Sequence, residues 1–374
     1  MTRSKRIVIA AMMSSVALAF AGASVGDDEA APPAPIADIF APPAEFADEY
    51  GDYRSPLKFA DGAPVRTKED WAKRRAEIRK QWHAIMGPWP ALIEKPKVQT
   101  LETTPRDGFA QHRVRVEIAP GRTVNGYLLV PDGDGPFPGV VVPFYDAETG
   151  AGLNDRENLD YGRQLTKRGF VSLSIGTPGS THYPDEENAI QPLSYLAYVA
   201  ANCGNALAAM ENVDGARIGI IGHSYGGKWA MFAAALHDGF AAAAWSDPGS
   251  MFDESRGNVN YWERWYLGYE PARQRTPGIP SEKNPRTGAY KVLVEKGHDL
   301  HELHALIAPR PFLVSAGSED PPKRWIALNH TIAVNRLLGY EHRVAMTNRP
   351  GHNPRPQDNE KLYAFFEHFL NAKQ

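Results

Sequence analysis

Two kinds of hydrophobic pattern alternate along most of the chain. Short runs rich in β-branched residues are typical of strands buried on both faces, and longer segments with apolar residues three and four apart are typical of helices lying on a core. The predicted strands are 139–143, 170–175, 217–221, 240–246, 311–316 and 342–346. The predicted helices are about 157–168, 193–210, 228–236, 323–338 and 359–370. This alternation predicts an α/β fold, with a mostly parallel sheet and helices on both faces.

The segment before this alternation has a different pattern. A capping-box sequence at 67–70 and apolar residues at helical spacing predict a helix that ends near Gly87. Apolar and polar residues then alternate over 113–118, and a second apolar run follows the turn at 119–121. This pattern predicts antiparallel strands at the N-terminal side of the sheet.

One long segment, about 248–298, interrupts the alternation. It is rich in glycine, proline and aromatic residues, and it follows the strand that ends at Ser246. Long segments of this kind are usually functional, and its place puts it over the carboxyl edge of the sheet, where ligands bind in open α/β folds. We therefore expect a lid-like insertion in which Trp262 and Trp265 contact substrate, although such rings also serve as packing.

The first 60 residues show no pattern of a folded core. Three basic residues precede an apolar run at 7–21 and small residues suited to cleavage, so residues 1–23 are predicted to be a signal peptide. Residues 24–60 are rich in alanine and proline and are predicted to be a tether. The remaining 61–374 are predicted to be one hydrolase domain. We expect an exported, periplasmic or secreted protein with no stable membrane anchor after cleavage.

Composition narrows the possible partners. The 374 residues carry a formal net charge of −3 and no basic block beyond the first few residues, so nucleic acid is not an expected partner. The single cysteine, Cys203, has no mate for an internal disulfide and is predicted to be a core residue. No cofactor motif was identified, and we expect none.

The sequence Gly222-His223-Ser224-Tyr225-Gly226 fits the pattern G-x-S-x-G. It follows a predicted buried strand and leads directly into a predicted helix. This context is that of a nucleophile elbow, in which a tight turn holds a serine in a strained backbone conformation above the sheet edge. Ser224 is therefore the predicted nucleophile.

A serine hydroxyl needs a general base and an acid that orients the base. His352 lies in a Gly/Pro loop after the last predicted strand, and Asp320 lies in the acidic loop after the strand 311–316. Ser224, Asp320 and His352 therefore follow the order expected of this architecture. Asp247, at the end of the preceding strand, and Glu319 remain alternatives for the acid.

Acyl transfer also requires donors for the developing oxyanion. We expect one donor to be the backbone N–H of Tyr225, and the other to come from Phe144 or Tyr145 after the strand 139–143. The run His298, His301 and His304 has a spacing of three that spreads the rings around a helix. We therefore predict no metal site there, and interpret these histidines as solvated or supporting residues.

From about Gly139 to the end, the chain resembles the α/β-hydrolase superfamily. More narrowly, it resembles bacterial carbohydrate esterases of the glucuronoyl esterase and acetyl xylan esterase type. The resemblance rests on the elbow sequence 222–228, on the sequence His301 to Pro311, and on Ser318-Glu319-Asp320. It implies a Ser-His-Asp esterase and assigns Lys228 to the substrate sugar. Glucuronoyl esterases typically carry arginine after the nucleophile, where this chain has Tyr225.

The sequence thus favours an exported serine esterase acting on a small-molecule or glycan ester through an acyl-enzyme. A peptidase of the prolyl oligopeptidase kind is an alternative, but the residues before the core are too few for a β-propeller gate. The second alternative is a catalytically silent hydrolase fold used as a binding module. An ordered serine, acid and histidine set favours the enzyme.

Overall fold

The computed structural model of this chain describes residues 31–184 and 190–371. The predicted signal peptide, 1–23, lies outside the described residues. The described strands are β1 (Val98–Arg106), β2 (Phe109–Ala119), β3 (Arg122–Pro131), β4 (Phe137–Pro143), β5 (Val171–Ile175), β6 (Val213–His223), β7 (Ala242–Ser246), β8 (Phe312–Ala316) and β9 (Val344–Asn348). No helix among the described residues is long and apolar enough to cross a membrane.

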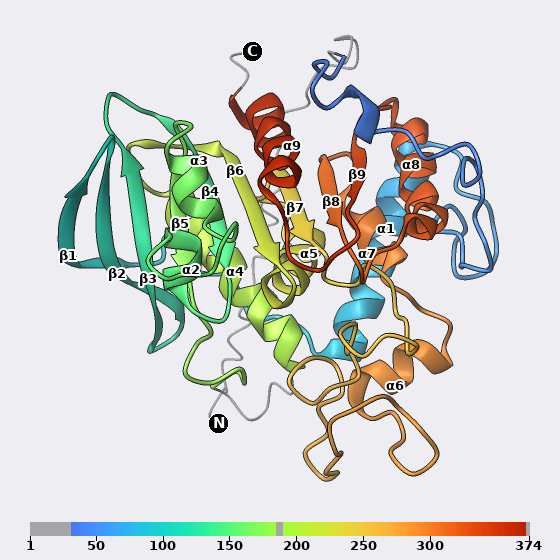
Figure 1. The fold of residues 1–374 in the computed structure, drawn as a ribbon. Coiled ribbons are helices and arrows are strands. Elements are labelled where there is room, and N and C mark those ends of the chain that lie inside the picture. The colour runs from blue at the N-terminus through green and yellow to red at the C-terminus, as the bar shows by residue number, and fades with distance from the viewer. Residues whose placement is uncertain (1–30, 185–189, 372–374) are drawn as a thin grey trace, which may run out of the picture. The chain divides into compact units, whose positions relative to one another are not determined.

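The nine strands form one sheet in the order β1-β2-β3-β5-β4-β6-β7-β8-β9. Strands β1, β2 and β3 pair antiparallel, β3 pairs antiparallel with β5, and all pairs from β5 to β9 are parallel. The predicted α/β fold is confirmed, including the antiparallel strands at its N-terminal side. Strands β4, β6, β7, β8 and β9 each precede a candidate site residue, and all five end at the same edge of the sheet (Figure 1).

Helices cover both faces of this sheet (Figure 1). They are α1 (Lys68–Met86), α2 (Ala147–Ala151), α3 (Tyr161–Thr166), α4 (Pro192–Ala208), α5 (Tyr225–Leu236), α6 (Gly288–Glu295), α7 (His301–Ile307), α8 (Trp325–Leu338) and α9 (Pro356–Phe366). Helices α1, α4, α5, α7 and α8 share one hydrophobic cluster with one face of the strands, and α3 and α9 share a second cluster with the other face. The shorter turns are η1 (Ala37–Ile39), η2 (Pro322–Arg324) and η3 (Glu367–Asn371).

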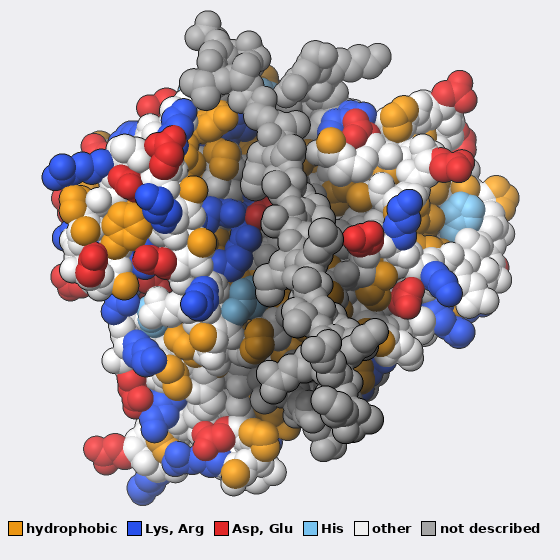
Figure 2. Space-filling model, turned by 180° about the vertical axis from the view of Figure 1, so that it is seen from behind, with side chains coloured by type: hydrophobic (Ala, Val, Ile, Leu, Met, Phe, Trp, Pro, Cys, Tyr) orange, Lys and Arg blue, Asp and Glu red, His pale blue; other side chains and the backbone are white. Residues whose placement is uncertain are grey.

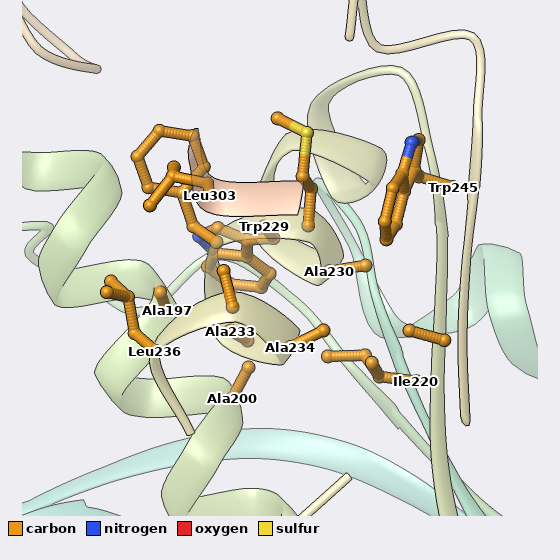
Figure 3. Close-up of a cluster of buried hydrophobic side chains, with 14 of the residues drawn as sticks. Ala197, Ala200, Ile220, Trp229, Ala230, Ala233, Ala234, Leu236, Trp245 and Leu303 are labelled. Carbon is orange, nitrogen blue, oxygen red and sulfur yellow. The ribbon is translucent and has the colours of Figure 1, made fainter. Parts of the chain in front are cut away.

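Helix α5 is completely enclosed in the fold. All of its residues are buried, although it is built largely of small side chains. Figure 3 shows Ala230, Ala233 and Ala234 among side chains from β6, β7, α4 and α7. Alanine lets neighbouring elements approach closely without loss of helix propensity. The helix that follows the candidate nucleophile is thus fixed by packing on all sides.

The predicted tether differs from the structure over residues 36–60. Ile36 and Ile39 are 0% and 2% exposed and belong to the cluster beneath α9. His330 Nε2 bonds Tyr50 O at 3.0 Å, and His301 Nε2 bonds Arg54 O at 2.7 Å. Isolated apolar residues in a proline-rich stretch are enough to dock it, because the main domain supplies the core. Figure 2 shows acidic and basic side chains interspersed over the described part of the back face.

Candidate active site

Ser224 occupies the turn between β6 and α5. Its backbone has φ 50° and ψ −109°, a strained conformation that non-glycine residues rarely adopt. A Cβ atom at Gly222 would lie 2.1 Å from Gly226 O, and one at Gly226 would lie 2.0 Å from Pro143 O. Both glycines are therefore required by close backbone contacts. The strand, turn and helix predicted for the elbow are all present.

His352 lies on the loop that follows β9. Its Nδ1 is 2.7 Å from Oδ2 of Asp247, and its ring centroid is 4.7 Å from that of His223, the residue before Ser224. An acceptor at Nδ1 fixes the proton there and leaves Nε2 as the basic nitrogen. Nε2 has no hydrogen-bond partner among the described residues, so it remains available to accept a proton. Such serine–histidine contacts commonly tighten only when substrate binds.

Asp247, which contacts His352, is held firmly at the end of β7. Its side chain is fully buried, and its backbone φ is 51°. Oδ1 accepts hydrogen bonds from the backbone N–H groups of Gly317 at 2.7 Å, Glu319 at 3.0 Å and Asp320 at 3.0 Å. These donors favour the charged carboxylate and fix its direction. The loop after β8 thus supports the acid instead of supplying it.

The prediction that Asp320 contacts the histidine is wrong in this structure. Asp320 is fully buried, and its carboxylate accepts hydrogen bonds from Ser250 N at 2.5 Å, Ser250 Oγ at 2.7 Å and Gly249 N at 3.0 Å. Burial raises the pKa of Asp320; Arg324, 3.6 Å away, opposes the rise, and Asp247 adds to it. Because its oxygens point to the start of the insertion, Asp320 anchors that segment and does not orient His352.

Glu319, the other alternative acid, is 7% exposed and accepts from Asn258 Nδ2 at 3.2 Å. Together with Asp247 and His352 it offers three possible metal-ligand atoms within 4.8 Å of one another. The Asp247 oxygens already accept three backbone N–H groups and contact the imidazole. A cation would have to displace these contacts, so the donor set does not fit a metal centre.

Two backbone groups near Ser224 are suited to an oxyanion. Tyr225 is the first residue of α5, where a backbone N–H has no intrahelical acceptor. The N–H of Phe144 donates to Ile175 O at 3.0 Å, so Phe144 is excluded as the second donor. The N–H of Tyr145 has no acceptor among the described residues. Of the three predicted donors, Tyr225 and Tyr145 therefore remain.

Aromatic rings form one wall beside the elbow. The Tyr145 ring stacks on Tyr225 with centroids 4.4 Å apart and planes 10° apart, and Tyr225 also contacts Tyr266 at 5.9 Å. Tyr145 is 52% exposed and Trp265 is 43% exposed. Trp262, by contrast, is 1% exposed, and its Nε1 donates to Glu263 at 3.1 Å. The structure therefore places Trp265 at the surface of the insertion and Trp262 in its core, which contradicts substrate contact by Trp262.

Lys228 does not reach an open site mouth. It is 2% exposed, and its Nζ donates to Pro248 O at 2.7 Å and Asn258 O at 3.1 Å. The Nζ also lies 5.0 Å from the Tyr261 ring centroid and 5.5 Å from that of Tyr266. Burial lowers the pKa of Lys228 to about 8, opposed by Asp320 and Glu319. The predicted contact with a sugar is therefore contradicted, because the ammonium fastens the insertion to α5.

Arg349 was missed by the sequence reasoning. It is 2% exposed, and it donates to Ser315 O at 2.8 Å, to Ser246 Oγ at 3.0 Å and to His352 O at 2.5 Å. These bonds tie the histidine loop to the ends of β7 and β8. The signal available in the sequence was an arginine three residues before His352. A guanidinium that becomes buried at such a position needs several carbonyl acceptors, and its bonds to them fix the loop.

His223 also supports the residues around His352. Its Nδ1 lies 3.0 Å from Ser246 Oγ, and burial lowers its pKa well below the usual range, with His352 and Arg349 adding to the effect. The three histidines 298, 301 and 304 are buried, so of the two interpretations, solvated or supporting residues, the solvated one is wrong. His298 pairs with Glu302 at 2.7 Å, and His304 stacks on Trp245 at 5.3 Å.

Comparison with known proteins gives a family match over part of the chain. The family described as PETase, PET hydrolase-like, matches residues 140–255. A search of curated protein sequences gives no match. The match to the PET hydrolase-like family covers the elbow and Asp247 but not His352.

Solved structures resemble most of the chain. A glucuronoyl esterase from Solibacter usitatus has 18% identity and a TM-score of 0.63, covering 84% of this chain and 97% of its own. A promiscuous CE15 esterase from a marine bacterial metagenome has 17% identity and a TM-score of 0.64, covering 85% and 97%. A glucuronoyl esterase from Sporotrichum thermophile has 20% identity and a TM-score of 0.54, covering 88% and 92%. At these identities, the likeness shows that the chain has the α/β-hydrolase fold.

Proposed function

We propose that this protein is a serine esterase that hydrolyses a carboxylic ester carried by a carbohydrate. The observation that carries the proposal is the 2.7 Å contact between His352 Nδ1 and Asp247, in a chain that holds Ser224 in a strained elbow. A buried carboxylate that fixes a histidine tautomer beside such a serine is the arrangement that nucleophilic acyl transfer requires.

In the proposed mechanism, Ser224 Oγ attacks the ester carbonyl while His352 Nε2 takes its proton. Asp247 orients the imidazole and stabilises the imidazolium that forms. The N–H groups of Tyr225 and Tyr145 stabilise the oxyanion, and the alcohol leaves with the proton returned by His352. Water, activated by the same nitrogen, then hydrolyses the acyl-enzyme and releases the acid.

The carbohydrate part of the proposal has two supports. Structural neighbours that cover most of the chain are named glucuronoyl esterases. Two exposed aromatic rings also connect to the elbow: Tyr145 stacks on Tyr225, and Trp265 contacts Tyr266, which in turn contacts Tyr225. Amphipathic rings suit the apolar faces of sugars. Tyr225 cannot supply the fixed charge of an arginine, so we expect acetylated or other neutral sugar esters to be used at least as well as uronate methyl esters.

The test is hydrolysis of a panel of acetyl, feruloyl and methyl-uronate sugar esters by the purified protein and by Ser224→Ala. We expect turnover of at least one sugar ester, a burst of product from an activated ester, and loss of nearly all activity in the variant. An inert wild-type protein would favour the binding module. Cleavage of peptides in preference to esters would favour the peptidase.

We further propose that the protein is exported, on the basis of the basic residues and apolar run within 1–23. N-terminal sequencing of protein recovered from outside the cytoplasm should give a start near residue 24. Retention of the full N-terminus in the cytoplasmic fraction would overturn this proposal.

A further inference from the structure

A polar cleft is lined in part by Tyr145, one of the two proposed oxyanion donors. It has a volume of about 410 Å³ and is bounded by β2, β3, the start of α2 and the loop after β5. Its polar lining includes Arg113, Asn125, Tyr127, Tyr145, Glu148 and Thr177. The carboxyl end of β5 belongs to the sheet edge that carries Ser224, and β5 pairs in parallel with β4.

Three contacts join the cleft to Tyr145 and Tyr225, the two proposed oxyanion donors. Tyr145 lines the cleft, and one face of its ring is covered by Tyr225, yet 52% of the residue is exposed. Thr177, on the opposite side, donates its N–H to Tyr145 O at 3.1 Å and its Oγ1 to Tyr225 OH at 3.4 Å. Tyr145 therefore lines the cleft and also stacks on Tyr225, the residue that follows the nucleophile.

The chemistry of the lining points to a polyhydroxylated ligand. Asn125, Glu148 and Thr177 are exposed and offer both donors and acceptors. Tyr127 OH donates to Glu148 Oε1 at 3.3 Å, which holds that carboxylate at the cleft wall. An apolar acyl chain would strip water from these groups without replacing its hydrogen bonds. A sugar ring offers hydroxyls to them and an apolar face to Tyr145.

The charges of the cleft favour a neutral sugar. Arg113 already pairs with Glu102 at 3.2 Å, and Glu148 and Asp146 bring negative charge to the same walls. An anionic sugar would be repelled by both carboxylates, and the paired guanidinium would compensate only in part. Hydroxyl groups can accept from Asn125 and donate to Glu148 without either penalty.

We propose that this cleft is a subsite for a neutral sugar residue linked to the sugar whose ester is bound at Ser224. This inference rests on the proposed esterase function. It implies that the natural substrate is an oligosaccharide or polysaccharide ester, because a monosaccharide ester would leave the cleft filled with water.

The first test compares an acetylated xylo-oligosaccharide with the acetylated monosaccharide. In Glu148→Ala and in Asn125→Ala, kcat/KM for the oligosaccharide relative to the monosaccharide should fall by about five- to tenfold for each hydrogen bond lost. Glu295→Ala is the matched control, because Glu295 is an exposed acid that lines a separate cleft of about 380 Å³ beside α6. Its ratio should equal that of the wild type.

The second test measures binding without hydrolysis. Titration of Ser224→Ala protein with unesterified xylotriose should show binding, and adding Glu148→Ala should weaken it by a similar factor. Thermal unfolding of each variant confirms folding, and Glu148→Gln serves if the alanine variant is unstable. Sugar-ester hydrolysis with an unchanged ratio and no xylotriose binding would overturn the subsite and leave the esterase intact. Failure to hydrolyse any sugar ester would overturn the proposed function, and the xylotriose titration then decides the subsite alone.

Discussion

His352 Nδ1 contacts Asp247 at 2.7 Å, while the Asp320 carboxylate points to the first residues of the insertion. Asp247→Asn should therefore lower kcat on an ester by about 1,000- to 10,000-fold, because an amide at this position favours the wrong histidine tautomer. Asp320→Asn should cost much less in kcat and should instead lower the stability of the fold. Steady-state kinetics and thermal unfolding of both variants provide the test, and a reversed order of the kcat losses would return the acid to Asp320.

Arg349 should act as a positioning residue for the base. Arg349→Met removes the bonds to Ser246, Ser315 and the carbonyl of His352, so kcat should fall by at least about tenfold with little change in KM. Arg349→Lys should restore part of the loss by retaining one or two donors.

The matched control is Arg310→Met, because Arg310 also donates to buried carbonyls, those of Ala234, His237 and Phe240. It lies at the opposite end of α5 from Ser224, so its loss should lower stability without a selective loss of kcat. Equal kcat losses in the two methionine variants, corrected for the folded fraction, would mean that Arg349 has only a structural role.

The two tryptophans of the insertion should separate packing from recognition. Trp262→Ala should reduce the free energy of unfolding by about 3 to 5 kcal/mol, because the side chain is fully buried. Trp265→Ala should change it by less than about 0.5 kcal/mol and should raise KM for a sugar ester more than for a phenyl ester. Equal effects of Trp265→Ala on both substrates would exclude stacking on the sugar.

Because of Lys228, the free energy of unfolding should increase with pH in mildly alkaline solution. Its pKa is about 8 when folded and near 10.5 when unfolded, so between these values the unfolded chain binds a proton that the folded chain does not. Raising the pH across this window therefore favours the folded state, by up to about 1.4 kcal/mol per pH unit. Denaturant unfolding of wild type and Lys228→Met from pH 7 to 10.5 should show a more positive slope in the wild type than in the variant.

Most of the fold was predictable because buried strands and amphipathic helices leave strong local patterns. The positions of Ser224 and His352 followed from strand ends, since parallel strands bring their carboxyl ends together. The choice between Asp247 and Asp320 was not local. Both follow core strands, and only the backbone donors of 317–320, which converge on Asp247, decide which carboxylate faces the imidazole.

The orientation of Lys228 was also not predictable, because it too depends on residues distant in the sequence. A lysine in the first turn after the elbow could extend toward solvent or fold under the insertion, and the sequence favours neither. The insertion decides, because the carbonyls of Pro248 and Asn258 replace water around the ammonium. The resemblance to carbohydrate esterases assigned Lys228 to the substrate, and the structure places its ammonium against these two carbonyls instead.

The complete enclosure of α5 has a consequence for how the protein fluctuates. Amide hydrogens of residues 228–236 are sheltered by packing on every side, so we expect them to exchange with solvent only when the whole domain unfolds. Residues 253–285, which contain no helix or strand, should exchange through local opening at much lower free energy. The serine would then stay fixed in place while the segment that follows β7 changes shape.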